Sequence, residues 1–209
     1  MTSHDPDPRI ALTGGRPGRP NGAVTTPRVA VLVEGHSDRV ALEALAHRHD
    51  RDLAAEGIEV IAMGGITNVR RFAARYGPRG LGSQLAGLYD AAEEPQLRRG
   101  LAAAGFTVAL QPDGPMELGF FRCEADLEDE LIRALGVEAV EAVIDTAGET
   151  RSLRLLAAMP VQRSWTREAV LRRFLGARSG RKALYAALLV DALEPDDAPA
   201  PLSALLARL

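Results

Sequence analysis

The stretch VAVLVEGHSD, residues 29–38, joins five consecutive apolar residues to two acidic residues four positions apart. A continuous aliphatic and β-branched run is typical of a strand buried on both faces of a parallel sheet. Glu34 and Gly35 end this run, and Asp38 falls in the first turn of the next predicted helix, where the helix dipole favours a negative charge. The stretch therefore predicts a strand, a turn and a helix with two carboxylates at their junction.

Strand and helix patterns alternate on the C-terminal side of this stretch. Residues 38–56 have helical spacing and stop at Gly57, residues 58–63 form a second strand, and residues 67–76 form a short basic helix. Residues 82–90 read as a third strand that again ends in an acid, Asp90, and residues 95–104 as a helix. FTVAL and GFFRC, within residues 106–123, supply one or two further strands. This alternation predicts an α/β fold with a parallel sheet flanked by helices.

The chain divides into three parts. Residues 1–27 hold many of the prolines, show no periodicity and are predicted to be a disordered Pro/Gly-rich tail. Residues 28–125 form the α/β core. Residues 126–209 contain five stretches of helical period between ADLEDELIRALG and RKALYAALLVDAL, and no long linker precedes them. We expect this C-terminal helical extension to pack on the core.

Composition excludes several classes of protein. The 209 residues carry a net charge of −3, so no global basic field attracts nucleic acid, and any such contact must rest on local arginine clusters. The single cysteine, Cys123, rules out an internal disulfide and a cysteine zinc cage. No apolar stretch reaches the roughly 20 residues of a membrane helix, and the first residues lack a secretion signal. A soluble cytoplasmic protein that does not enter a membrane is the expectation.

Three acids are expected at one edge of the sheet. In open α/β sheets ligands bind beyond the carboxyl ends of the strands, where Glu34 and Asp90 both fall and where the helix of Asp38 begins. Converging carboxylates repel each other unless a cation neutralises them, and hard oxygen ligands suit Mg²⁺ or Mn²⁺. Taken singly, Asp38 could serve only as a helix-terminus acid, and Asp90 could simply open a turn.

These residues resemble a known family. VEGHSD, with Glu34, Gly35 and Asp38, is similar to the first motif of the Toprim domain, the phosphoryl-transfer module of topoisomerases, bacterial primases and OLD (overcoming lysogenization defect) nucleases. The second Toprim motif is Asp-x-Asp, often extended to a third acid. LYDAAEE, residues 88–94, offers Asp90 first and Glu94 third, and it has Ala92 where the middle acid stands in the family.

Two later segments resemble the OLD branch in particular. FFRCEADLEDELIRALG is similar to the OLD strand followed by an acidic helix, with Glu128 as its acid, and Lys182 in GRKALYAALLVDAL is similar to the OLD lysine near the scissile phosphate. The resemblance implies a Toprim (Rossmann-like) fold with Glu34, Asp38, Asp90 and Lys182 as catalytic residues. It implies metal ligation by five acids: Glu34, Asp38, Asp90, Glu94 and Glu128. From the residues alone, Lys182 could be a solvated lysine at a helix start, and Glu128 could belong to a solvated acidic face.

The function implied is a Mg²⁺- or Mn²⁺-dependent DNA endonuclease or nickase that hydrolyses phosphodiester bonds. Glu34 could be a metal ligand or a general base. The rival interpretation, favoured by Ala92, is a non-catalytic Toprim-like module that binds nucleic acid, a nucleotide or a partner protein. Larger OLD proteins add an ATPase, but GARSGRKA, residues 176–183, lacks the spacing of a phosphate-binding loop. The sequence thus predicts a free-standing nuclease-like module, or one that uses an ATPase in trans, and leaves the oligomeric state open, with a dimer among the options.

Overall fold

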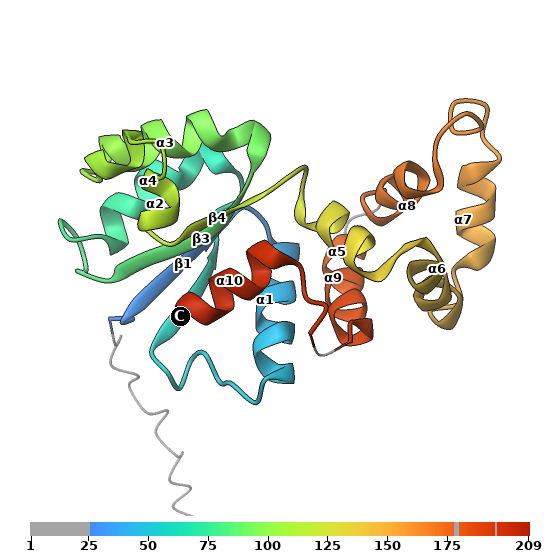
Figure 1. Ribbon diagram of the computed structural model, residues 1–209, viewed down its shortest axis with the longest axis horizontal. Helices are drawn as coiled ribbons and strands as arrows, with labels where there is room; N and C mark the ends of the chain where they lie inside the picture. The colour runs from blue at the N-terminus through green and yellow to red at the C-terminus, as the bar shows by residue number, and fades with distance from the viewer. Residues whose placement is uncertain (1–25, 178–179, 195) are drawn as a thin grey trace, which may run out of the picture.

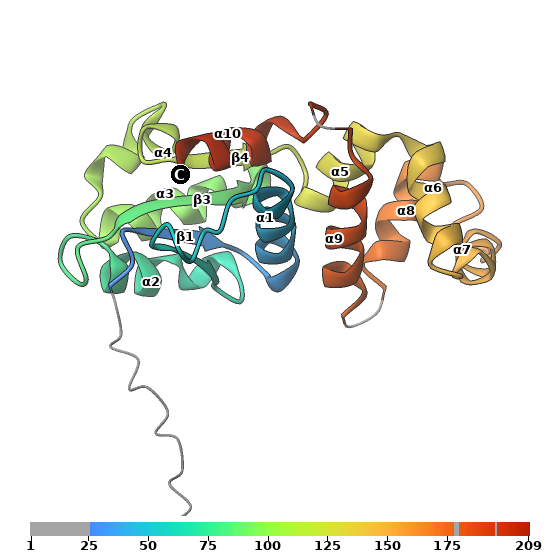
Figure 2. The ribbon, with the colours of Figure 1, turned by 90° about the horizontal axis from the view of Figure 1, so that it is seen from below.

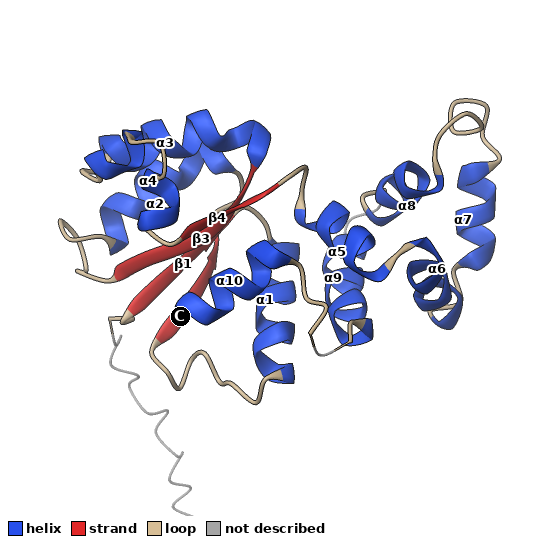
Figure 3. Ribbon diagram, viewed as in Figure 1, coloured by secondary structure: helices blue, strands red, loops and turns tan. Residues whose placement is uncertain are grey.

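The protein is described by a computed structural model that covers residues 26–177, 180–194 and 196–209. Four strands form one sheet in the order β2-β1-β3-β4 (Figures 1 and 3). They are β1 (Val29–Val33), β2 (Ile58–Ala62), β3 (Gln84–Asp90) and β4 (Phe120–Cys123). Every neighbouring pair is parallel. The predicted α/β fold with a parallel sheet is confirmed. The predicted tail, apart from its last two residues, lies outside the described residues.

Strand β1 is central, and all five of its residues are buried. Its alternate residues Val29, Val31 and Val33 join the hydrophobic cluster on one face of the sheet, whereas Ala30 and Leu32 join the cluster on the other face. Successive side chains of a strand point to opposite faces, so burial on both sides requires an uninterrupted apolar run. This is the physical reason for the composition of residues 29–33.

Helices cover both faces of the sheet. One face packs against α2 (Val69–Tyr76) and α3 (Glu94–Ala103), with the short helix α4 (Gly114–Glu117) beside them. The other face packs against α1 (His36–Arg48) and α10 (Ala200–Arg208). Short 3₁₀ turns, η1 (Ile66–Asn68) and η2 (Ala91–Glu93), follow β2 and β3.

The segment FTVAL is not a strand. Residues Thr107–Leu110 form the 3₁₀ turn η3, which packs against α3 and buries Ala109, so only GFFRC supplies a strand, β4. Short apolar runs do not distinguish a strand from a buried helical turn, because four residues are too few to show a period.

The five helical stretches predicted after residue 125 are all helices. They are α5 (Leu127–Leu135), α6 (Val137–Thr146), α7 (Thr150–Ala157), α8 (Arg167–Leu175) and α9 (Arg181–Ala192). Figures 1 and 2 show them to one side of the sheet, with α9 next to α1. One hydrophobic cluster runs from the sheet through α1 and α9 into α5, α6 and α8. Within the described residues, no helix is long and apolar enough to cross a bilayer.

Helix α10 was not expected from the sequence. The chain leaves the helical part after α9 and returns to the sheet, where α10 packs against β3 and β4 (Figure 2). Two arginine side chains of the sheet domain hold α10 in this position. Arg28 Nη2 donates a hydrogen bond to the backbone oxygen of Leu209 at 3.0 Å, and Arg51 Nη1 donates one to the backbone oxygen of Leu206 at 2.7 Å. The last residues of the chain therefore lie on the sheet, although the sequence-based division groups them with residues 126–209.

Candidate functional site

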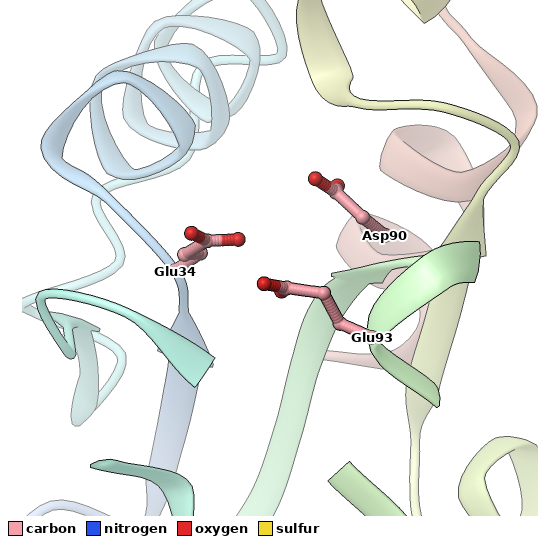
Figure 4. A group of neighbouring side chains, drawn as sticks. All are labelled: Glu34, Asp90 and Glu93. Atoms are coloured by element: carbon pink, nitrogen blue, oxygen red, sulfur yellow. The ribbon is translucent and has the colours of Figure 1, made fainter. Parts of the chain in front are cut away.

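Glu34 and Asp90 lie side by side because their strands do. β1 and β3 are neighbouring parallel strands; Glu34 directly follows β1, and Asp90 is the last residue of β3. Figure 4 shows the two side chains converging with that of Glu93. One carboxylate oxygen from each of these three residues lies within 4.8 Å of the others. The carboxyl edge of the sheet thus carries a three-acid group.

The third acid of this group is Glu93, the neighbour of Glu94, which the resemblance implies as a ligand. The turn η2 follows β3 directly and carries Glu93 towards Glu34, while Glu94 begins α3 and pairs with Arg98 at 2.6 Å. Ala92 is exposed between them. The sequence contains two adjacent glutamates, and only the 3₁₀ geometry of the turn decides which of them faces the site.

Asp38 has two roles at once. Its Oδ2 accepts a hydrogen bond from the Gly35 amide at 2.7 Å, which caps the start of α1, and its side chain also lines the site cavity. Burial raises the pKa of Asp38 to about 6; the Gly35 hydrogen bond opposes this, and the charges of Glu128 and Glu34 add to it. The helix-terminus interpretation and the site interpretation of this acid are therefore compatible.

Glu128 and Lys182 reach the same cavity from the helical part. Glu128 comes from α5 and is 6% exposed, and its Oε2 lies 3.2 Å from Nζ of Lys182 at the start of α9. Burial lowers the pKa of Lys182, but the charge and hydrogen bond of Glu128 outweigh burial, so the net shift is upward. Glu128 is thus not part of a solvated acidic face, and Lys182 forms an ion pair with it.

Two residues that were not expected at the site position these helices. Asp126 caps α5 by accepting from the Asp129 amide at 2.8 Å, and it binds Arg172 of α8 at 2.6 Å. Arg181 is buried: its guanidinium lies 4.1 Å above the Phe174 ring and 2.8 Å from the Glu149 carboxylate. Asp126 is recognisable as a cap from the sequence; the burial of Arg181 has no sequence signal.

The site contains one cavity of about 510 Å³. Its lining includes six charged residues that come from both parts of the chain: Glu34, Asp38, Asp90, Asp126, Glu128 and Lys182. His36 also lines it. All of the predicted site residues except Glu94 are thus brought together, and Glu93 takes the place of Glu94 beside Glu34.

The acids at this edge are strongly crowded. Burial, followed by the charge of Glu34, raises the pKa of Asp90 to about 7. Burial, with a hydrogen bond to Glu34 and the charges of Glu34 and Asp90, raises the pKa of Glu93 to about 7. Such shifts mean that the folded chain does not tolerate all of these negative charges without compensation.

The donor set fits a divalent cation. Within the described part of the chain, Oε2 of Glu93 and Oε1 of Glu128 are buried and have no hydrogen-bond partner. Buried carboxylate oxygens are normally hydrogen-bonded or bound to a metal. Carboxylates alone, with no cysteine and no converging pair of histidines among them, suit a hard ion such as Mg²⁺ or Mn²⁺.

A parallel sheet with acids at the carboxyl ends of two neighbouring strands, and a helix acid beside them, is the arrangement of a Toprim-type domain. Residues 28–91 match the family profile described as the Toprim domain of overcoming lysogenization defect protein-like proteins. This segment contains β1, α1, β2, α2 and β3, and with them Glu34, Asp38 and Asp90. The chain therefore carries an OLD-like Toprim domain.

The likeness to OLD proteins extends beyond this segment. The C-terminal region of the Burkholderia pseudomallei OLD protein superimposes with a TM-score of 0.63 at 24% identity, covering 88% of this chain and 97% of that one. The C-terminal region of the Xanthomonas campestris pv. campestris OLD protein superimposes with a TM-score of 0.64 at 26% identity, covering 87% and 93%. The helical part is thus included in the shared fold. No curated protein sequence shows significant similarity to the chain.

Proposed function

We propose that this protein is a Mg²⁺- or Mn²⁺-dependent DNA endonuclease or nickase. The observation that supports it best is that Glu34 and Asp90, which converge with Glu93, line the same cavity as the Glu128–Lys182 pair. Phosphodiester hydrolysis needs oxygen ligands for a divalent cation and a positive charge near the phosphate, and the cavity holds both.

Two groups of acids would hold the cations. Glu34, Asp90 and Glu93 form the first group, and Asp38 and Glu128, which line the same cavity as Glu34 and Asp90, form the second. A bound divalent cation would supply Lewis acidity towards the phosphate and would lower the pKa of a water molecule. Glu128 comes from α5, whereas the other four acids come from β3, from the turn after it, and from the turn and helix that follow β1, so the helical part contributes directly to the proposed site.

Lys182 has the properties of a residue that stabilises phosphate charge. Glu128 orients its amine, the raised pKa keeps it protonated at neutral pH, and its side chain is 49% exposed, so one side of the ammonium remains open to a substrate. A fixed cation of this kind acts on the negative charge that accumulates during in-line attack.

Nicking of supercoiled plasmid tests the proposal. We expect relaxation of the plasmid with Mn²⁺ or Mg²⁺, none with EDTA, and loss of at least about 10²-fold in rate for Glu34→Gln. Glu117→Gln is the matched control, because Glu117 is exposed on α4, away from the cavity lining. DNA binding without cleavage in any metal would instead favour the non-catalytic interpretation.

A further inference from the structure

Basic residues are distributed unevenly along this acidic chain. Residues 60–89 contain Arg70, Arg71, Arg75 and Arg79 and no acidic residue, whereas the whole chain has 28 acids and a net charge of −3. The segment includes α2, which carries three of these arginines. A positive surface is therefore concentrated on one side of the sheet domain.

The arginines of this segment are exposed and have no acidic partner among the described residues. Arg70, Arg71, Arg75, Arg79 and the neighbouring Arg99 of α3 are all exposed, and no ion pair or side-chain hydrogen bond joins them to another described residue. We call these five residues the α2 arginine surface. Many other arginines are already bonded to carboxylates or carbonyls within the fold: Arg48, Arg51, Arg98, Arg122, Arg133, Arg167, Arg172 and Arg181.

Close helix packing brings α3 into this surface. A Cβ at Gly100 would lie 2.2 Å from Val69 Cγ1 and 3.3 Å from the Arg70 amide nitrogen, so α3 approaches the first turn of α2 at a distance that only glycine permits. Arg99 is thereby placed beside the start of α2. Arg71 and Arg75 are one helical turn apart, about 6 Å along the axis.

The α2 arginine surface begins next to the site. The amides of Gly64 and Gly65 donate to the carbonyl of Glu34 at 2.9 and 3.1 Å, and the Asn68 side-chain amide donates to the carbonyl of Gly64 at 3.2 Å. Asn68 immediately precedes α2. The loop before α2 is thus hydrogen-bonded to the backbone of Glu34. The α2 arginine surface therefore starts near the acid cluster and extends away from it along α2.

We propose that the α2 arginine surface binds the phosphate backbone of duplex DNA on one side of the site, an inference that rests on the proposed function for its substrate. Free guanidinium groups bind phosphates bidentately and release condensed counterions. Stacked single strands need exposed aromatic rings, but Tyr76 is buried and Phe72 is half-buried under Arg71. The surface therefore contacts the phosphates of the DNA backbone and makes no contacts with the bases.

The test measures binding of a short duplex of mixed sequence in EDTA, so that cleavage does not contribute. The variants are Arg71→Gln/Arg75→Gln and the matched control Arg151→Gln/Arg154→Gln, which removes two exposed arginines of α7 and changes the net charge equally. For the α2 pair we expect weaker binding and a plot of log K against log salt whose slope falls by about 2, about 0.9 per phosphate contact. Arg71→Lys/Arg75→Lys should retain most of the slope.

The outcomes separate this inference from the proposed function. A normal salt slope in the α2 pair, or an equal loss in the α7 pair, overturns the duplex-binding surface even if the protein cleaves plasmid. Preferential binding of single strands that survives the α2 substitutions overturns it as well. Duplex binding that depends on the α2 pair, in a protein that cleaves nothing, supports the surface and counts against the nuclease.

Discussion

The ammonium of Lys182 lies 3.2 Å from the carboxylate of Glu128, a residue 54 positions earlier in the chain. Only one oxygen of that carboxylate is used: the other, Oε1, is buried and has no partner among the described residues. The pair joins α9 to α5 at the wall of the acid-lined cavity. Lys182 thus has both a structural partner and an open side.

Lys182→Met should affect turnover and stability together. We expect a rate loss of about 10²-fold or more, and a loss of about 1–3 kcal/mol in the free energy of unfolding because Glu128 is left buried without its cation. Adding Glu128→Gln should recover the stability but not the activity. Plasmid nicking and urea unfolding provide the two readouts. A stable single variant with normal turnover would remove Lys182 from the site.

Glu93 and Glu94 form a matched pair of variants. Glu93→Ala removes a member of the three-acid group and should weaken Mn²⁺ binding by about tenfold or more, at least the effect of losing a residue that supports a metal ligand. Glu94→Ala only releases Arg98 and should leave metal affinity nearly unchanged. Calorimetric titration of both variants checks this. The reverse order of effects would restore the ligand assignment made from the sequence.

Without metal, the protein should lose stability as the pH rises from about 4 to about 7. The pKa of Asp38 is raised to about 6, and those of Asp90 and Glu93 to about 7. The folded state therefore binds more protons than the unfolded state in this range, so the free energy of unfolding falls with increasing pH. Above about pH 7 these acids are ionised in both the folded and the unfolded state, so their effect on the free energy of unfolding no longer changes with pH.

Thermal unfolding in EDTA across this pH range measures the effect. Mn²⁺ should raise the melting temperature most near and above pH 7, where the acids ionise and can bind it. A melting temperature that rises steadily from pH 4 to pH 7 in EDTA would contradict the crowding of the acids.

Asp38→Asn and Asp38→Ala should separate the cap from the metal site. Both remove the charge and should weaken metal binding, but asparagine keeps an acceptor for the Gly35 amide. In EDTA we expect the alanine variant to be about 1 kcal/mol less stable than the asparagine variant, the usual contribution of a cap. Equal stabilities in urea unfolding would show that the Gly35 hydrogen bond contributes nothing.

The sequence by itself determined the order of strands and helices and the edge where Glu34 and Asp90 meet. Residues 29–33 are apolar without interruption because β1 is buried on both faces, and Glu34 and Asp90 end strands that turned out to be neighbours. Strand ends and helix starts depend on local sequence patterns, so they can be predicted from the sequence alone. The short apolar run of FTVAL fits two local structures, so the sequence predicted one or two strands within residues 106–123, and the structure has one.

Only the tertiary structure decided which side chains meet. The choice of Glu93 over Glu94 depends on the direction of one 3₁₀ turn, and the burial of Glu128 depends on α9 packing near α5. Arg71 is exposed and has no acidic partner in the described part of the chain, whereas Arg181 is buried beside Glu149. The sequence does not distinguish these two arginines, because the partner of an arginine depends on which residues the fold places beside it. Contacts between distant segments arise from packing of the whole core, and the periodicity of a short stretch of sequence does not predict them.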